Sequence, residues 1–280
     1  MTMRAQMSED LQELTVSVVV YRPDPRLLLR TLTSFAAAAA GLRRTAMLPI
    51  HLYLIDNGGL PDISVAFEEL AKSGVRWTVL SGHGNVGYGR GHNLAIEQVA
   101  SRYHLILNPD IDVEPHALVR ALAFMGAHRE VGLLSPAIVD DIGQPQYLCR
   151  QYPALIDLFV RGFMPPAVRR LFAARLARYE MRAQINERDT IWDPPIVSGC
   201  FMLFRTSVLK QLAGFDPRYF LYFEDYDLSL RAHVVARVVY VPTVRVLHHG
   251  GGASRKGWAH IRMFVASAFK FFNRFGWKWF

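Results

Sequence analysis

Two short acidic segments contain the residues of this chain that are best suited to chemistry. The first is Asn108-Pro109-Asp110, followed closely by Asp112, after an apolar run. The second places Glu224, Asp225 and Asp227 within four residues, at the predicted start of a helix. Carboxylate oxygens are ligands that Mg²⁺ and Mn²⁺ prefer, and a carboxylate can also remove a proton from a hydroxyl. One segment could therefore hold a cation against a diphosphate while the other acts as a general base.

Each of these features also has a purely structural interpretation. The first segment can form an Asx-Pro turn in which an aspartate caps the next helix. In the second, the helix dipole favours acids at the N-terminus, and Arg231 can pair with them or with a phosphate. His248 and His249 can be metal ligands or can simply close a strand. Residue types and spacing alone leave these alternatives open.

A glycine-rich loop over residues 82–91 precedes a helix predicted over residues 92–100. The N-terminus of a helix is a natural site for anions, including phosphate. The loop lacks the Gly-Lys-Ser/Thr of a Walker loop, and it is a poor match to the dinucleotide fingerprint GxGxxG. By itself, the loop is equally consistent with a tight turn.

Strands and helices alternate in the first half of the chain, which predicts an α/β fold with a parallel sheet. Ligands of such sheets bind beyond the carboxyl ends of the strands. The loops at Asp56, at residues 82–91 and at residues 108–110 should therefore converge on one crevice. The predicted elements are strands over 16–20, 50–55, 75–80 and 104–107, and helices over 27–40, 63–72 and 92–100, with a further helix near Pro115.

The second half is less regular. An arginine-rich stretch over residues 147–195 is expected to be an insertion on the acceptor side, with one helix over 167–186. The remaining predicted elements are strands over 197–204, 238–241 and 244–247 and helices over 206–213 and 224–236.

The composition narrows the function classes. With 280 residues, half of them apolar, the chain can form one large α/β domain. The net charge of +8 is compatible with nucleic acid, anionic membranes or phosphorylated substrates, but no nucleic-acid-binding motif is present. Two cysteines do not make a disulfide framework, and no signal peptide or membrane-spanning run is evident. A soluble cytoplasmic protein without a nucleic-acid partner is expected.

The C-terminal segment, residues 256–280, is aromatic and basic. Drawn as a helix, it places an aromatic stripe beside a basic one, which suits an anionic membrane surface. A helix docked on the catalytic domain or on a second subunit is the alternative. The stripes are Phe264, Ala268, Phe271, Phe275 and Trp279, and Arg262, Lys270, Arg274 and Lys278.

Taken together, the motifs resemble the inverting glycosyltransferases of family 2, which have the GT-A fold, and especially their rhamnosyltransferase-like branch. The resemblance spans roughly residues 16–254. It rests on residues 16–21, 55–58, 84–93, 107–110, 198–205, 214–220 and 223–228, with His249 and Ser254.

The resemblance implies roles for individual residues. Asp225, with Glu224 beside it, matches the catalytic base, and Asp56 would bind a pyrimidine base. Asp110 matches the last carboxylate of the metal motif, where Asn108 replaces the first, and His249 matches a late metal-side histidine, with His248 and Asp112 as alternatives. The implied donor-binding set comprises Asp56, Asn57, Asn85, Gly87, Tyr88, Arg90, Asn93, Asn108 and Asp110.

The implied activity is transfer of a sugar from a nucleotide donor to a hydroxyl with inversion, because a single base suffices when no covalent intermediate forms. The expected donor is dTDP-L-rhamnose, with UDP-galactofuranose or another UDP- or dTDP-hexose as alternatives, and the cofactor is Mg²⁺ or Mn²⁺. The acceptor would be a glycan or a lipid-linked saccharide at the inner face of the plasma membrane. A non-catalytic binding module is the competing hypothesis, and a homodimer is left open. The expected organisation is a catalytic domain over 1–255, with a leader over 1–14, and the helix over 256–280.

Overall fold

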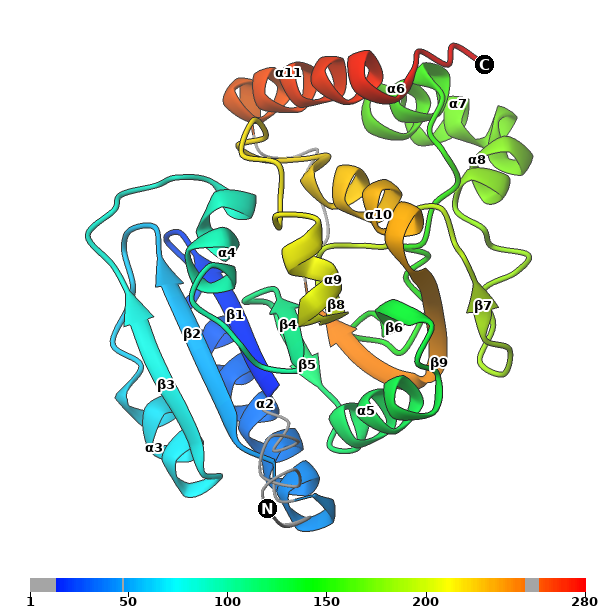
Figure 1. The fold of residues 1–280 in the computed structure, drawn as a ribbon. Helices are drawn as coiled ribbons and strands as arrows, with labels where there is room; N and C mark the ends of the chain where they lie inside the picture. The colour runs from blue at the N-terminus through cyan, green and yellow to red at the C-terminus, as the bar shows by residue number, and fades with distance from the viewer. Residues whose placement is uncertain (1–13, 47, 250–256) are drawn as a thin grey trace.

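The computed structural model describes residues 14–46, 48–249 and 257–280. Residues 1–13 of the expected leader and Ser254 lie outside these ranges. The first half of the chain forms four adjacent parallel strands in the order β3-β2-β1-β4 (Figure 1). All four match predicted strands, because their runs are rich in apolar and β-branched residues. β1 and β4 are buried on both faces of the sheet, as is typical of parallel strands, whereas the edge strand β3 is largely exposed. The four strands are β1 (Leu14–Val20), β2 (Ile50–Asp56), β3 (Val75–Leu80) and β4 (Tyr103–Leu107).

The second half extends the same sheet with mixed pairing, in the order β8-β6-β9-β5 after β4. β8 is antiparallel to β4 and β6, whereas β6 and β9 are parallel. The two strands predicted over 238–241 and 244–247 are one irregular strand, β9, whose register with β6 shifts near Pro136. The strands are β5 (Ile111–Val113), β6 (Val131–Val139), β7 (Ile191–Trp192), β8 (Phe201–Arg205) and β9 (Arg237–His248).

Helices cover both faces of the sheet. The apolar side chains of α2, α3 and α5 form the main core on one face, and those of α4, α9 and α10 form a second core on the other. α4 begins at Tyr88, inside the glycine-rich loop, and ends four residues before the predicted position. The helices are α2 (Pro25–Thr45), α3 (Ser64–Lys72), α4 (Tyr88–Ile96), α5 (Ala117–Ala127), α9 (Thr206–Gln211) and α10 (Glu224–Val235).

The expected insertion and the C-terminal helix pack together beside α10 (Figure 1). The single helix predicted over 167–186 is wrong, because two short helices, α7 (Pro166–Leu171) and α8 (Ala173–Tyr179), meet at Phe172. α6 (Leu155–Phe163) precedes them. α11 (Gly257–Phe275) buries Phe271 and Phe272 in a mainly aromatic cluster with Tyr219, Phe223 and Leu158. None of the helices within the described ranges has the length and apolarity needed to cross a bilayer.

Candidate active site

The loops after β2 and β3 meet at the carboxyl end of the parallel strands. The buried Asn57 donates from Nδ2 to the carbonyl oxygen of Gly87 at 3.0 Å and to Asn85 Oδ1 at 3.3 Å. Its Oδ1 lies 3.0 Å from His83 Nε2. The glycine-rich loop is thereby fixed above β2, and the predicted convergence of these loops is found.

Tyr88 connects this loop to the segment after β4. Its hydroxyl lies 2.8 Å from Asn108 Oδ1 and 2.7 Å from the carbonyl oxygen of Gly199, so its one hydrogen is shared between two acceptors. Its backbone N–H donates to the carbonyl oxygen of Phe220 at 3.0 Å. Burial, with the nearby carboxylates of Glu224 and Asp225, raises the pKa of Tyr88 well above its ordinary value. Tyr88 is therefore a neutral hydroxyl in the middle of the site.

Asp225 lies on the other side of Gly199. Its Oδ2 accepts the Gly199 N–H at 3.0 Å, and its Oδ1 accepts the N–H of Tyr226 at 2.9 Å. Burial raises the pKa of Asp225, although these two backbone donors and Arg150 oppose the shift. Contacts thus run continuously from Asn108 through Tyr88 and Gly199 to Asp225, and the two acidic segments meet at one site.

Glu224 is buried beside Asp225. Burial, together with the charge of Asp225, raises its pKa to about 8, and its Oε2 has no hydrogen-bond partner. The preceding residues Tyr222 and Phe223 have φ angles of 71° and 65°, a conformation that non-glycine residues rarely adopt. This turn sets the direction in which Glu224 and Asp225 enter α10. Strained turns of this kind cluster at functional sites.

The third acid, Asp227, has a structural role. Its side chain is fully buried, with Oδ1 bonded to Arg231 Nε at 2.5 Å and Oδ2 to Arg274 at 2.8 Å. Arg231 also donates to the carbonyl oxygens of Leu212 and Gly214. The salt-bridge interpretation of Arg231 is therefore the one that the structure supports.

The histidines at the end of β9 divide between two aspartates. His248 Nε2 lies 3.5 Å from Asp110 Oδ2, whereas His249 contacts Asp112, with 2.9 Å between Nε2 and Oδ2, and also pairs with Asp141. Burial alone would raise the pKa of Asp110, but the hydrogen bond and charge of His248 lower it. His248, predicted from the sequence as the alternative to His249, is thus the histidine beside Asp110. A metal role for His249 stays a prediction.

These residues fit a cation that is held only partly by protein. The Oδ1 atoms of Asp110 and Asp112 and the Nε2 of His249 are buried without a hydrogen-bond partner, although that Nε2 is close to Asp112. Among the described residues, no group of three or more metal-type ligands is arranged around a common point. Asp110 and Asp112 would therefore hold the ion together with substrate oxygens. When bound, it would neutralise charge on a departing diphosphate.

The other predicted donor-binding residues mainly hold backbone. Asp56 Oδ1 accepts the N–H of Gly58 at 2.8 Å. Asn93 bonds the Phe215 backbone through both its Nδ2 and its Oδ1, and Arg90 donates to the carbonyl oxygen of Pro217 at 2.6 Å. The contacts of Asn93 and Arg90 link α4 to the segment before α10. The nucleotide-binding roles of the three residues remain predictions.

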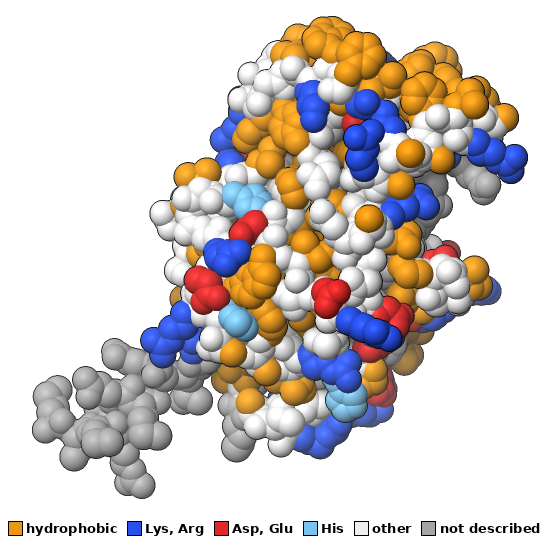
Figure 2. Space-filling view, turned by 90° about the vertical axis from the view of Figure 1, so that its right-hand side faces the viewer, with side chains coloured by type: hydrophobic (Ala, Val, Ile, Leu, Met, Phe, Trp, Pro, Cys, Tyr) orange, Lys and Arg blue, Asp and Glu red, His pale blue; other side chains and the backbone are white. Residues whose placement is uncertain are grey.

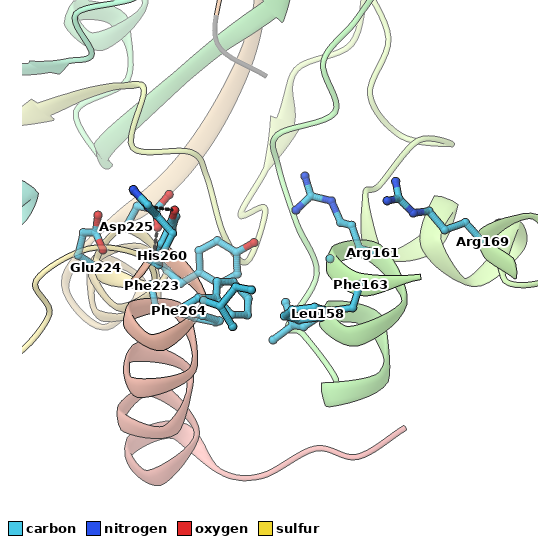
Figure 3. A pocket seen from close by; sticks show the side chains of 13 residues that line it. Leu158, Arg161, Phe163, Arg169, Phe223, Glu224, Asp225, His260 and Phe264 are labelled. Atoms are coloured by element: carbon cyan, nitrogen blue, oxygen red, sulfur yellow. Dashed lines mark hydrogen bonds between the residues drawn. The ribbon is translucent and has the colours of Figure 1, made fainter. Parts of the chain in front are cut away.

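A cavity of about 530 Å³ opens in front of the acids. One wall carries Glu224 and Asp225 with His260 of α11, and the other carries Arg161 of α6 and Arg169 of α7 (Figure 3). Sequence reasoning did not identify His260 or single out these two arginines. The arginine-rich composition of residues 161–182 was the available signal, but only the packing of α6 against α11 shows which arginines face the cavity.

Comparison with known proteins agrees with this arrangement. A family model described as glycosyltransferase like family 2 matches residues 12–262. The chain is 32% identical over 251 residues to an N-acetylglucosaminyl-diphospho-decaprenol L-rhamnosyltransferase of Mycobacterium tuberculosis, covering 84% of this chain and 76% of that protein. It is 27% identical over 201 residues to the rhamnosyltransferase WbbL of Escherichia coli, covering 68% and 72%.

Solved structures share the fold at low sequence identity. S. aureus TarS 1-349 has a TM-score of 0.54 at 14% identity, with 93% of this chain and 72% of that chain covered. The mannosyltransferase PcManGT from Pyrobaculum calidifontis, solved with GDP-Man and Mn²⁺, has a TM-score of 0.57 at 16% identity, with 92% and 64% covered. The GT-A fold implied by the sequence is confirmed. The chain therefore belongs to the glycosyltransferase-like family 2 and is a glycosyltransferase.

Proposed function

We propose that this glycosyltransferase moves L-rhamnose from dTDP-L-rhamnose to a sugar hydroxyl of a lipid-linked diphosphate acceptor, with inversion. The proposal rests on the position of Asp225, which bonds to Gly199 and lies near Tyr88. The Tyr88 hydroxyl in turn contacts Asn108, next to the aspartates that follow β4. The names of the two rhamnosyltransferase relatives support the donor, and the name of the mycobacterial relative supports the acceptor.

Asp225 is the general base in this proposal. Its burial and raised pKa make it a stronger base than an exposed aspartate, while the Gly199 and Tyr226 amides fix its orientation. It would take the proton of the acceptor hydroxyl as that oxygen attacks the anomeric carbon and the bond to the diphosphate breaks. Glu224, whose pKa is raised by burial and by the charge of Asp225, would keep a proton and leave Asp225 as the charged member of the pair.

Asp110 and Asp112 would hold Mg²⁺ or Mn²⁺ against the donor diphosphate, with His248 orienting Asp110. Asp56, Asn57, Asn85 and Tyr88 line the loops where the nucleotide would lie. Two of the structural neighbours were solved with Mn²⁺, which supports a divalent ion of this kind.

We extend the proposal to a peripheral position on the inner face of the plasma membrane. Hydrophobic side chains gather at the end of the molecule formed by α6 and α11, with Lys and Arg side chains beneath them (Figure 2). Phe159, Phe269 and Trp279 are each more than half exposed there. Two of the four residues in the predicted basic stripe make contacts within the protein: Lys270 donates to the Arg218 carbonyl oxygen, and Arg274 pairs with Asp216 and Asp227.

A screen of nucleotide sugars tests the function. The purified chain is incubated with dTDP-L-rhamnose, UDP-galactofuranose and other UDP- and dTDP-hexoses, with Mg²⁺ or Mn²⁺ and a lipid-linked N-acetylglucosaminyl diphosphate, and the released nucleotide is measured. Turnover of dTDP-L-rhamnose alone is expected. Turnover of another donor would disprove the rhamnose assignment, and binding of nucleotide without any turnover would favour the non-catalytic module.

A further inference from the structure

The cavity in front of the acids continues into a second hollow between α6 and α11. This groove has a volume of about 490 Å³, and every residue lining it is apolar. Leu158, Phe163 and Phe264 line both the cavity and the groove. The two hollows therefore adjoin at these three residues, and a molecule long enough to pass them would extend from the groove into the cavity that Asp225 lines.

Two arginines line the wall of the cavity that faces the acidic pair (Figure 3). Arg161 precedes Phe163 by two residues on α6, and its Nε lies 3.2 Å from Glu180. Arg169 on α7 donates a hydrogen bond from Nε to the Met164 carbonyl oxygen at 2.7 Å. Within the described part of the chain, the terminal nitrogens of Arg169 donate to no protein group. A fork of guanidinium donors is thus available beside the cavity, and such forks match phosphate oxygens.

The cavity and the adjoining groove thus bring three kinds of chemistry together: an acidic pair on one wall, two cations on the facing wall and an apolar groove next to both. A lipid-linked sugar diphosphate carries three matching groups: a sugar hydroxyl, a diphosphate and a hydrocarbon chain. We propose that Arg161 and Arg169 bind the diphosphate of the acceptor and that the groove between α6 and α11 holds the first part of its lipid chain. This inference rests on the proposed function and assigns the acceptor site within it.

The position of the arginines favours this diphosphate over the head groups of bulk phospholipid. Both line the cavity that also contains Glu224 and Asp225 (Figure 3). The neighbouring Arg170 is exposed and does not line the cavity. It is the matched control for Arg169, because it is adjacent on the same short helix.

The first experiment compares two acceptors with the same N-acetylglucosamine and the same lipid chain, one with a diphosphate linkage and one a simple glycoside. Arg161→Ala and Arg169→Ala should each raise KM for the diphosphate acceptor about tenfold, the loss typical of a hydrogen bond to a charged group. KM for the glycoside should change less than about twofold. Arg170→Ala should leave both values near wild type. Arg161→Ala also removes the ion pair with Glu180 and could lower stability. In that case Arg169→Ala alone decides the test.

The second experiment tests the groove with diphosphate acceptors of short and long lipid chains in detergent. The wild-type chain should prefer the long chain, because each buried methylene contributes to binding. Phe269→Glu, which places a charge in the groove, should remove most of that preference. Val234→Glu, at a position 83% exposed on α10, is the matched control and should retain it.

The outcomes separate the inference from the function on which it rests. If the wild type transfers the sugar but the arginine variants lose activity equally on both acceptors, the diphosphate assignment alone is overturned. The same holds if KM for the diphosphate acceptor is unchanged in these variants. Weaker binding to phosphatidylglycerol vesicles with unchanged KM in detergent would assign the arginines to bulk lipid instead. Absence of transfer by wild type to either acceptor would overturn the proposed function and this inference together.

Discussion

The ring of Phe271 on α11 lies 5.2 Å, centroid to centroid, from the ring of Phe223 in the turn before the acidic pair. Both side chains are buried, and Phe264 of the same helix packs on Phe223 at the same distance. Phe223 and Tyr222 have positive φ angles, which persist only where surrounding structure holds them. The C-terminal helix therefore supports the turn that presents Glu224 and Asp225.

Phe271→Ala should lower both stability and turnover. Removing a fully buried phenylalanine costs about 3–5 kcal/mol of unfolding free energy, and loosening the turn should displace Asp225. Denaturant unfolding and kcat measured on the folded fraction test this. Trp258→Ala, at an 81% exposed position on the same helix, should change neither. A normal kcat for folded Phe271→Ala would mean that the turn holds without α11.

Asp225→Asn should abolish transfer and leave nucleotide affinity nearly intact. An amide cannot take the acceptor proton, and loss of a general base typically costs about 100-fold or more in rate. The amide oxygen can still accept the Gly199 N–H, so the fold should survive. Turnover and nucleotide titration by calorimetry measure the two effects. Unchanged turnover would remove Asp225 from the role of base.

The parallel half of the fold was predictable because its signals are local. The runs in β1 to β4 consist mainly of aliphatic, aromatic and β-branched residues, and the segments between them have helical periodicity. β6 was missed because Pro136 interrupts its run, and a proline within a run argues against a strand. The 147–195 insertion is shaped by contacts with α11 and with the 276–280 segment, such as Leu155 N–H to the Lys278 carbonyl oxygen, and no local pattern encodes these.

The candidate site was predictable as a set of segments but not as a set of contacts. The alternation of strands and helices indicated that Asp56, the glycine-rich loop and Asp110 share one edge. The link from Tyr88 to Asp225 passes through the Gly199 backbone, and a backbone group has no sequence signature. Likewise, the spacing of three acids within four residues does not reveal that Asp227 is structural, and only its packing against Arg231 and Arg274 shows this.

Asp227→Asn should act on stability rather than on chemistry. The change leaves Arg231 and Arg274 without their shared, fully buried carboxylate, which typically costs about 3–5 kcal/mol. Denaturant unfolding measures the loss. Asp193→Asn breaks the exposed pair with Arg237 and should cost less than about 1 kcal/mol. Equal effects in the two variants would contradict the structural role of Asp227.

Asp110→Asn should weaken the dependence of donor binding on a divalent ion. Asp110 has a buried Oδ1 without a partner, and an amide is a poorer ligand for a hard cation than a carboxylate. Nucleotide affinity is measured with and without Mg²⁺ or Mn²⁺. His249→Ala tests the late histidine, because it should alter metal dependence if His249 is a ligand or orients Asp112, and an unchanged dependence would exclude both roles. Equal wild-type affinity with and without the ion would contradict a metal role for Asp110.

Glu224→Gln should flatten the dependence of stability on pH. Because burial and Asp225 raise the pKa of Glu224 from 4.5 to about 8, the folded chain keeps a proton that the unfolded chain releases. Stability should therefore fall as pH rises between these two values. Glutamine carries no such proton, so the variant should lose part of that slope and gain stability relative to wild type toward pH 8. Denaturant unfolding across this window tests it, with the exposed Glu68→Gln as control. An unchanged slope in Glu224→Gln would place the proton elsewhere in the acidic pair.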